Sequence, residues 1–352
     1  MTTPIARTKK TEASQKETHM KAIIRTQFGS PDVLHLAEVE KPVPQDDEIL
    51  VKVYASSINA LDRHQLKSSP LLMRILIGNG LRKPKDQRLG ADIAGRVEAV
   101  GANVTQFHPG DEVFGQATAG GFAEYACAPE KKVVLKPANL SFEAVSTIPV
   151  AALTALQSLR DKGQVQPGQK VLIDGASGGV GTFAVQIARS YGAEVTAVCS
   201  SKNVELVRSL GADQVIDYTR EDATRKKQQY DLILAVNGYH SLFAYQRILR
   251  PGGMYILIGG PSAQTVLLAM LRTMLLGPLL SRTGGRKIGF LGVANVNQKD
   301  LNFVKELFEA GKVVPVIDTC YSLDKTAEGF RYLIDKHARG KVVITIDQNN
   351  NS

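Results

Sequence analysis

A glycine-rich segment at residues 175–181, GASGGVG, follows the apolar run VLID and opens a stretch with helical periodicity. Gly175 and Gly178 permit a tight turn, and Gly178 and Gly179 leave room for the backbone to approach a pyrophosphate. Gly181 lets the helix pack closely against the turn. The helix N-terminus would then offer N–H groups and a positive dipole end to the phosphates. We therefore expect a dinucleotide site formed by Gly175, Ala176, Ser177, Gly178, Gly179, Val180 and Gly181.

The spacing of this motif is Ala176-x-Gly178-x-x-Gly181, so alanine replaces the first glycine of the commonest form. A structural turn without a ligand is the alternative interpretation. The context favours a ligand, because the motif follows a strand, opens a helix and leads to a second strand about 20 residues on.

The second strand of this unit ends without the acid that would bind the ribose 2′-hydroxyl of NAD. Ser200, Ser201 and Lys202 follow it instead, and their hydroxyls and ammonium suit the 2′-phosphate of NADPH. Alternatively, Lys202 is only a solvated lysine at a helix start. Tyr218, after the third strand, could flank the adenine or reach the same phosphate. We predict NADPH as the cofactor.

The elements around the turn alternate between strand and helix, which predicts parallel βαβ units and a doubly wound sheet. Helices are expected at residues 180–191, 203–210 and 241–249, and strands at residues 171–173, 195–198, 215–216, 232–236 and 254–258.

The two ends of the chain have a different pattern. Residues 20–140 consist of short strands divided by Gly and Pro, which is typical of an antiparallel barrel. A helical stretch follows Ser141, which is a suitable N-cap. After residue 290 we expect a helix at 299–310, a strand after Val313, a helix at 325–336 and a final strand in GKVVITI.

The composition is that of a globular protein, with 43% hydrophobic residues among 352. The net charge of +9 is a weak hint of an anionic partner. Without a dense basic run we expect no nucleic-acid partner. Three widely spaced cysteines indicate a reducing compartment, so we expect a cytoplasmic protein. Residues 1–19 are polar and predict a disordered tail, and no segment has the roughly 20 apolar residues of a membrane span.

Several segments together resemble signatures of the medium-chain dehydrogenase/reductase superfamily, on its zinc-free quinone oxidoreductase side. They include LGADIAGRVEAVG, GDEVFG, GGFAEYA, GASGGVG, LGADQVIDY, LRPGGMYILIG and ARGKVVITI, and they cover nearly the whole chain. The resemblance implies an α/β fold in which a Rossmann doubly wound parallel-sheet domain is inserted into a GroES-like β-barrel catalytic domain. The implied boundaries are a tail at 1–19, catalytic domain at 20–143, cofactor domain at 144–289, and a return to the catalytic domain at 290–352.

The positions that hold catalytic zinc in the zinc-dependent relatives can be checked one by one. They correspond to Asn59, Ala91 and a place near Val150, and the four structural cysteines are absent. Amide, methyl and isopropyl groups cannot form a zinc site. We therefore expect no zinc.

A reductase without zinc needs substrates that accept hydride readily, namely quinones or α,β-unsaturated carbonyl compounds. Asn59 is the candidate amide donor to the substrate oxygen, and Asp62 orients its loop or is purely structural. His64 is either a proton donor or a surface histidine; many relatives have Tyr there. The alternatives are a zinc-independent aldehyde or ketone reductase, or a cofactor-binding protein with little catalysis. The resemblance and the strand ends add Thr154, Asn237, Gly259 and Lys341 to the cofactor-binding set.

Two segments exceed the minimal fold, residues 68–88 and 264–290, and both mix Leu, Ile and Met with basic residues. Gly277-Pro278 should interrupt the second, so it should not span a bilayer. Domain packing or a homodimer contact is the favoured role. A lid over a small lipophilic carbonyl or quinone substrate is second, and peripheral docking on an anionic membrane is third.

Overall fold

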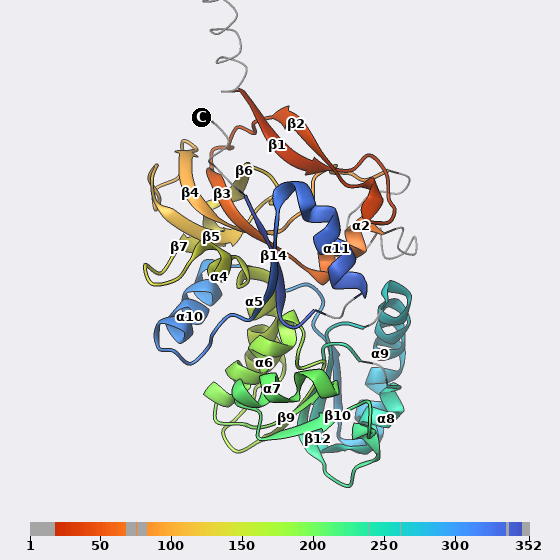
Figure 1. The fold of residues 1–352 in the computed structure, drawn as a ribbon. Coiled ribbons are helices and arrows are strands. Elements are labelled where there is room, and N and C mark those ends of the chain that lie inside the picture. The colour runs from red at the N-terminus through yellow and green to blue at the C-terminus, as the bar shows by residue number, and fades with distance from the viewer. Residues whose placement is uncertain are drawn as a thin grey trace, which may run out of the picture.

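The computed structural model describes residues 18–67, 75, 83–238, 240–260, 262–335 and 338–346. Nearly all of the predicted tail, and most of the 68–88 insertion, lie outside these residues. The described chain forms a barrel domain made from both ends of the sequence, above a parallel-sheet domain made from its middle (Figure 1). The predicted fold class is therefore confirmed.

The barrel domain contains a seven-stranded sheet in the order β14-β15-β3-β4-β5-β7, with β6 paired to β3, and a separate β1-β2 pair. Strand β15, from the end of the chain, pairs antiparallel with β3 near its start, which closes the split domain. Ser141 caps α4, as predicted, through a hydrogen bond from the Ala144 N–H to its Oγ. The elements are β1 (His19–Ile24), β2 (His35–Glu40), β3 (Glu48–Ile58), α2 (Ala60–Leu66), β4 (Asp92–Val100), β5 (Glu112–Gln116), β6 (Tyr125–Pro129), β7 (Val133–Leu135), α4 (Phe142–Ser146), β14 (Ile317–Ser322), α11 (Thr326–Asp335) and β15 (Lys341–Thr345).

The cofactor domain is a six-stranded parallel sheet in the order β10-β9-β8-β11-β12-β13. Val171 and Ile173 of β8 face the core beneath α5, α6 and α10, while Leu172 faces the core beneath α8 and α9, as the period of two requires. The elements are α5 (Pro149–Gln157), β8 (Lys170–Asp174), α6 (Gly179–Ser190), β9 (Glu194–Cys199), α7 (Val204–Ser209), β10 (Gln214–Asp217), β11 (Tyr230–Ala235), α8 (Leu242–Arg247), β12 (Leu249–Leu257), α9 (Ala263–Gly284), β13 (Lys287–Phe290) and α10 (Gln298–Glu309).

Helix α10 connects the two domains. Its Phe308 packs edge-on against Phe183 of α6, and it also contacts α5 and β7. The chain thus stays against the cofactor domain after residue 290 and rejoins the barrel sheet at β14.

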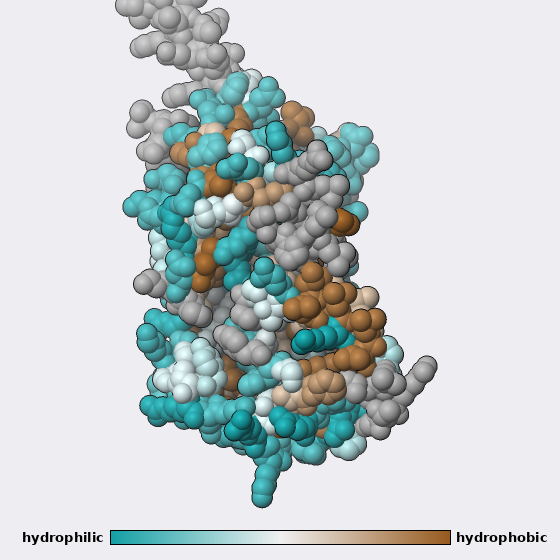
Figure 2. Space-filling model, turned by 90° about the vertical axis from the view of Figure 1, so that its right-hand side faces the viewer, coloured by the Kyte–Doolittle hydropathy of each residue, from teal (hydrophilic) through white to brown (hydrophobic). Residues whose placement is uncertain are grey.

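Helix α9 runs without interruption from Ala263 to Gly284, so the predicted break at Gly277-Pro278 is wrong. Pro278 removes the hydrogen bond to the carbonyl of Met274, but Met274 is exposed and water can satisfy that carbonyl. Gly285 ends the helix in the left-handed conformation with φ of 60°. Figure 2 shows an apolar surface in the lower half of this side of the molecule, where α9 lies. In the described part of the chain, no helix has the length and apolar content needed to cross a membrane.

Candidate active site

A cavity of about 640 Å³ lies between the two domains. It opens over the carboxyl ends of β8 and β11, where the sheet order changes direction and where ligands bind in open α/β sheets. Gly175 follows β8 and Asn237 follows β11, and a Cβ on Gly175 would lie 2.8 Å from the Cβ of Asn237. The two strand ends are therefore adjacent in one wall of the cavity.

The glycines of the turn have the separate roles that their spacing predicts. Gly175 has φ of +88°, which favours glycine. A Cβ on Gly181 would come within 2.2 Å of the Gly175 carbonyl oxygen, so this glycine lets the helix pack on the turn. A Cβ on Gly178 would meet nothing closer than 3.6 Å, which leaves the cavity side of the loop open.

The loop residues fit a dinucleotide. The first N–H groups of α6 have no partner within the helix, and Gly178 and Gly179 at this end of the helix line the cavity. Asn203, also in the wall, donates from Nδ2 to the Ser177 Oγ at 2.9 Å. Its buried Oδ1 finds no hydrogen-bond partner among the residues that the structure describes. An unpaired buried acceptor beside an open glycine loop is what a bound hydroxyl or amine would satisfy.

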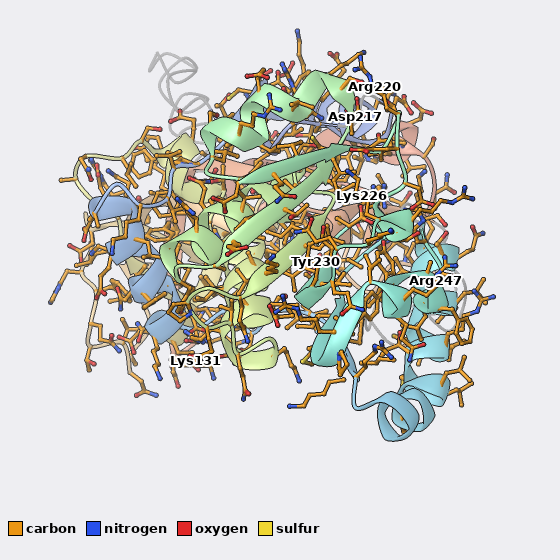
Figure 3. The ribbon with its side chains drawn as sticks, turned by 90° about the horizontal axis from the view of Figure 1, so that it is seen from below. Lys131, Asp217, Arg220, Lys226, Tyr230 and Arg247 are labelled. Atoms are coloured by element: carbon orange, nitrogen blue, oxygen red, sulfur yellow. The ribbon has the colours of Figure 1, made fainter. Side chains whose placement is uncertain are left out.

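The rim at the end of β9 differs from the prediction in one respect. Ser200 and Tyr218 line the cavity, and Lys202 is exposed beside them. However, the Ser201 hydroxyl donates to Asp217 at 2.5 Å, so it is not a donor for a phosphate. Asp217 comes from β10 and forms an ion pair at 3.5 Å with Arg220 (Figure 3). The acid missing from β9 thus has a counterpart on the next strand, paired with an arginine.

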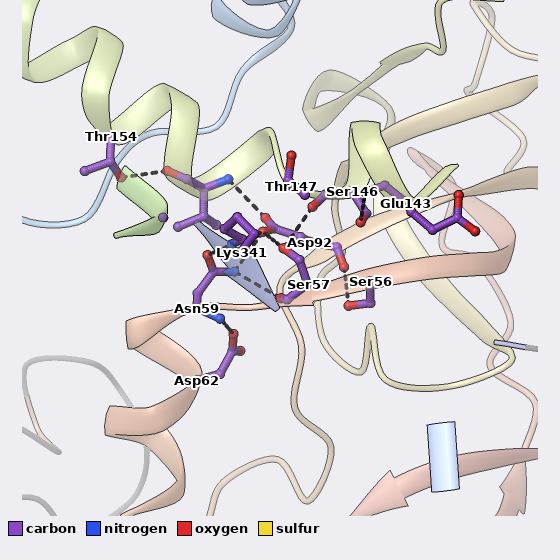
Figure 4. A network of polar contacts seen from close by, with 12 residues as sticks. Ser56, Ser57, Asn59, Asp62, Asp92, Glu143, Ser146, Thr147, Thr154 and Lys341 are labelled. Atoms are coloured by element: carbon purple, nitrogen blue, oxygen red, sulfur yellow. Dashed lines mark hydrogen bonds and ion pairs between the residues drawn. The ribbon is translucent and has the colours of Figure 1, made fainter. Parts of the chain in front are cut away.

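A buried polar network joins β3, β4 and β15 of the barrel domain to α5 (Figure 4). Asp92 accepts hydrogen bonds from the Ser57 hydroxyl at 2.7 Å, the Asn59 amide at 2.8 Å and the Val150 N–H at 3.0 Å. The Lys341 ammonium lies 3.4 Å from the same carboxylate and donates to the Asn59 Oδ1 at 2.5 Å. Asn59 and Val150, two of the three positions that correspond to zinc ligands in the zinc-dependent relatives, therefore both bind the Asp92 carboxylate, which is paired with Lys341.

The Lys341 side chain also reaches the glycine loop. A Cβ on Gly179 would lie 2.9 Å from the Lys341 Cδ, and the Gly340 N–H donates to the Ser177 carbonyl at 2.8 Å. Burial lowers the pKa of Lys341, while Asp92 and Asp62 oppose that shift. One ammonium thus connects the loop with the Asn59 amide.

The role of Asn59 as an amide donor to the substrate stays a prediction. Its Nδ2 donates to Asp92 and, at 3.3 Å, to the Ser57 carbonyl, so both amide hydrogens already have acceptors. Asn59 lines the cavity, but it could donate to a substrate oxygen only by giving up one of these bonds.

Asp62 and His64 differ in their positions. The Asp62 carboxylate is buried and accepts from the Asn59 N–H at 2.7 Å in a capping box, which agrees with the orienting role. Burial raises the pKa of Asp62 to about 7. His64 lines the cavity, and burial together with Arg63 and Lys67 lowers its pKa to about 4. His64 is therefore neutral at pH 7 and a weak proton donor.

Most of the predicted site residues line this one cavity. Asp62, Ala176, Gly181, Ser201 and Lys202 do not: Asp62, Ala176 and Gly181 lie behind the wall, and Ser201 and Lys202 are exposed outside it. The predicted site residues that line the cavity are Asn59, His64, Thr154, Gly175, Ser177, Gly178, Gly179, Val180, Ser200, Tyr218, Asn237, Gly259 and Lys341.

The sequence interpretation missed three polar residues of the site. Asp92 gave a signal, since it is an acid in a strand that is otherwise apolar at that end. Asp174 also gave one, because it ends the run VLID; burial raises its pKa to about 6, and the Tyr245 hydroxyl donates to it. Asn203 gave none, because its role depends on how α7 begins.

Comparison with known proteins bears on both domains. The alcohol dehydrogenase GroES-like domain matches residues 45–138, and the family described as zinc-binding dehydrogenase matches residues 210–344. A chloroplastic quinone oxidoreductase of Triphysaria versicolor is 34% identical over 334 residues, covering 90% of this chain and 94% of that one. The 2-methylene-furan-3-one reductase of Solanum lycopersicum is 32% identical, covering 92% and 79%. The structure of the quinone oxidoreductase from Coxiella burnetii superposes with a TM-score of 0.81 at 29% identity, covering 94% and 100%.

The inserted Rossmann domain, the glycine loop and these relatives together define an NAD(P)H-dependent oxidoreductase. The chain belongs to the medium-chain dehydrogenase/reductase superfamily, in its quinone oxidoreductase-like branch. Within the described ranges, no three His, Cys, Asp or Glu side chains gather closely enough to hold a metal ion.

Proposed function

We propose that the protein reduces quinones or α,β-unsaturated carbonyl compounds by hydride transfer from NADPH, without a catalytic zinc. The observation that carries this proposal is the buried Lys341–Asp92 ion pair, with Asn59 and Val150 bonded to the same carboxylate. A cation already neutralises Asp92 where the relatives with zinc place a metal site. The neighbouring amide and main-chain N–H are donors, which repel a metal ion.

The substrate class follows from this lack of a Lewis acid. Without a metal to polarise the carbonyl, the substrate must be a good hydride acceptor by itself. The names of the relatives include a quinone oxidoreductase, a 2-methylene-furan-3-one reductase and an alkenal/one oxidoreductase. The apolar part of the cavity wall suits a lipophilic acceptor; it includes Ile58, Val266, Met270, Phe290, Val293 and Leu333.

Bound NADPH would supply the hydride, and the chain's own residues would bind and orient. Gly178, Gly179 and the N-terminus of α6 would hold the pyrophosphate. Lys341 has used two N–H groups on Asn59 and Asp92, which leaves one for a phosphate oxygen beside Gly179. Thr154 would face the nicotinamide ribose, and Lys202 would bind the 2′-phosphate at the rim.

Protonation of the reduced product is assigned to water. His64 is neutral above pH about 4, so it does not act as an imidazolium donor at neutral pH. Val293 lines the cavity yet remains largely exposed, so solvent reaches the substrate side.

The proposal is tested by NADPH oxidation with a panel of benzoquinones, naphthoquinones, 2-alkenals and 2-enones, beside saturated aldehydes and ketones. Turnover of the first group alone supports it. Preference for saturated carbonyl compounds favours the zinc-independent aldehyde or ketone reductase. NADPH binding without turnover of any acceptor favours a cofactor-binding protein with little catalysis.

A cytoplasmic location is also proposed. Cys127, Cys199 and Cys320 are free thiols, which suits a reducing compartment. Some relatives are named as chloroplastic or mitochondrial, so fractionation of cells producing the full chain is the test.

A further inference from the structure

Helix α9 leaves three of its large apolar side chains exposed, while Leu267, Met270, Leu271 and Leu276 are half-buried. Val266 and Thr273 are buried against the cofactor domain, while Leu268, Met274 and Leu275 are 54%, 63% and 76% exposed. A surface helix normally buries its most apolar stripe and exposes polar residues. The exposure of three large apolar side chains on one helix indicates that this face meets something other than water.

The apolar face extends beyond α9. Phe243 of the neighbouring α8 is 56% exposed, and the two helices are in contact. Figure 2 shows an apolar surface at this height of the molecule, with a hydrophilic side chain set within it. Contiguous apolar patches of this kind mark interaction sites in soluble proteins. We call Phe243, Leu268, Met274 and Leu275 the α9 patch.

Three exposed basic residues lie on the elements that carry or adjoin the α9 patch. The segment Ala263–Gly284 contains no Asp or Glu, and its exposed Arg272 lies one turn from Leu268 on the same face. Arg247 of α8 and Lys287 of β13 are also exposed. A twofold copy of the patch would bring cations against cations. An anionic surface would attract each of them instead, and a long arginine can place its charge at the boundary while its stem stays in the apolar layer.

The α9 patch is continuous with the cavity. Val266 and Met270 of the same helix line it, and Val293, which also lines it, is 64% exposed. The cavity therefore opens to solvent on a side to which α9 contributes.

We propose that the α9 patch docks on an anionic lipid bilayer, with α9 lying in the interface. No described helix can cross a membrane, which agrees with a helix that lies on the surface. A lipophilic acceptor dissolved in the bilayer would then meet the cavity at its open side; this last consequence alone rests on the proposed function.

The test is flotation of the full chain with vesicles of phosphatidylcholine, with and without a fraction of phosphatidylglycerol. We expect binding to the anionic vesicles only, fading as salt is raised. Leu268→Ser, Met274→Ser and Leu275→Ser together should abolish it. Leu36→Ser, Val43→Ser and Leu135→Ser, which change exposed apolar residues of the barrel domain, should not.

Charge provides a second and milder probe. Arg272→Gln or Arg247→Gln should each weaken binding about fivefold, from roughly 1 kcal/mol per cation near an anionic surface. Lys131→Gln is the matched control, because Lys131 and Arg247 lie on opposite sides of the molecule (Figure 3). Turnover of a water-soluble acceptor should be unchanged in the α9 patch variants, since these side chains do not line the cavity.

Three results would overturn the proposal. One is a wild-type chain that ignores anionic vesicles at low salt. Another is a dimer in hydrodynamic measurements that the triple α9 variant converts to a monomer, which would assign the patch to a second copy of the chain. The third is equal loss of vesicle binding in Lys131→Gln and Arg247→Gln. Flotation needs no turnover, so an inactive protein would refute the proposed function without affecting this result.

Discussion

Replacing Lys341 with Met should destabilise the protein through Asp92. Methionine has a similar length but no charge, so it would leave the buried carboxylate without its cation. Breaking a buried pair from one side costs about 3–5 kcal/mol. Asp92 keeps three hydrogen bonds, from Ser57, Asn59 and Val150, so we expect the lower end of that range, about 3 kcal/mol.

The partner variant Asp92→Asn isolates the pair. By itself it leaves a buried ammonium, so it should also destabilise, but the double variant contains neither charge. We expect the double variant to be about 2 kcal/mol more stable than the sum of the two single losses predicts. The chain has no Trp, so urea unfolding is followed by far-UV circular dichroism. Additive losses, within about 0.5 kcal/mol, would refute the reasoning.

Three further predictions concern the loop, the rim and the capping box. Gly178→Ala should keep the free energy of unfolding but weaken NADPH binding more than about tenfold, whereas Gly181→Ala should lower the free energy of unfolding by more than about 2 kcal/mol. Calorimetric titration measures the binding and urea unfolding measures the stability. Equal behaviour of the two variants would count against the assigned roles. Lys202→Ala should weaken NADPH about ten- to a hundredfold and leave NADH unchanged; equal NADPH affinity in mutant and wild type would show that Lys202 does not bind the phosphate. The raised pKa of Asp62 makes the folded state bind a proton that the unfolded state releases. The free energy of unfolding of the wild type should therefore fall by up to about 4 kcal/mol as the pH rises from about 4 to about 7. Asp62→Asn should abolish this fall, and an unchanged pH dependence in that variant would contradict the prediction.

Local periodicity was sufficient to predict the framework. The parallel strands are buried apolar runs bounded by Gly, and the helix after Gly178 begins where the turn residues require it. Ser141 was recognisable as a cap because its partner, the Ala144 N–H, lies three residues away. These features depend on residues that are close together in the sequence, so the sequence alone was enough to predict them.

The site was predictable only where it followed the same local logic. The glycine loop did, but the Lys341–Asn59 bond joins residues 282 positions apart, and no local pattern indicates it. The hydrogen bond from Ser201 to Asp217 forms because β9 pairs with β10, and no local pattern indicates that pairing. Ser201 was therefore assigned to a phosphate instead. The contacts of the Asn59 amide are only partly local, because the Ser57 carbonyl lies two residues away but Asp92 comes from β4.

The continuity of α9 could not be predicted from composition. Gly277 and Pro278 are strong helix breakers in a local reading. The structure tolerates them because Gly277 is buried against the domain while Met274, whose carbonyl loses its partner, faces outward. Whether a freed carbonyl can reach water is decided by tertiary packing.

The central claim, hydride transfer from NADPH without zinc, is tested most directly by isotope transfer. Protein treated with a chelator and shown to be free of metal would be incubated with a 2-enone and NADPH deuterated at one or the other C4 position. We expect a saturated ketone that gains one deuterium from only one of the two cofactors, at the rate of untreated protein. No deuterium from either cofactor, or activity that returns only when zinc is added, would contradict it.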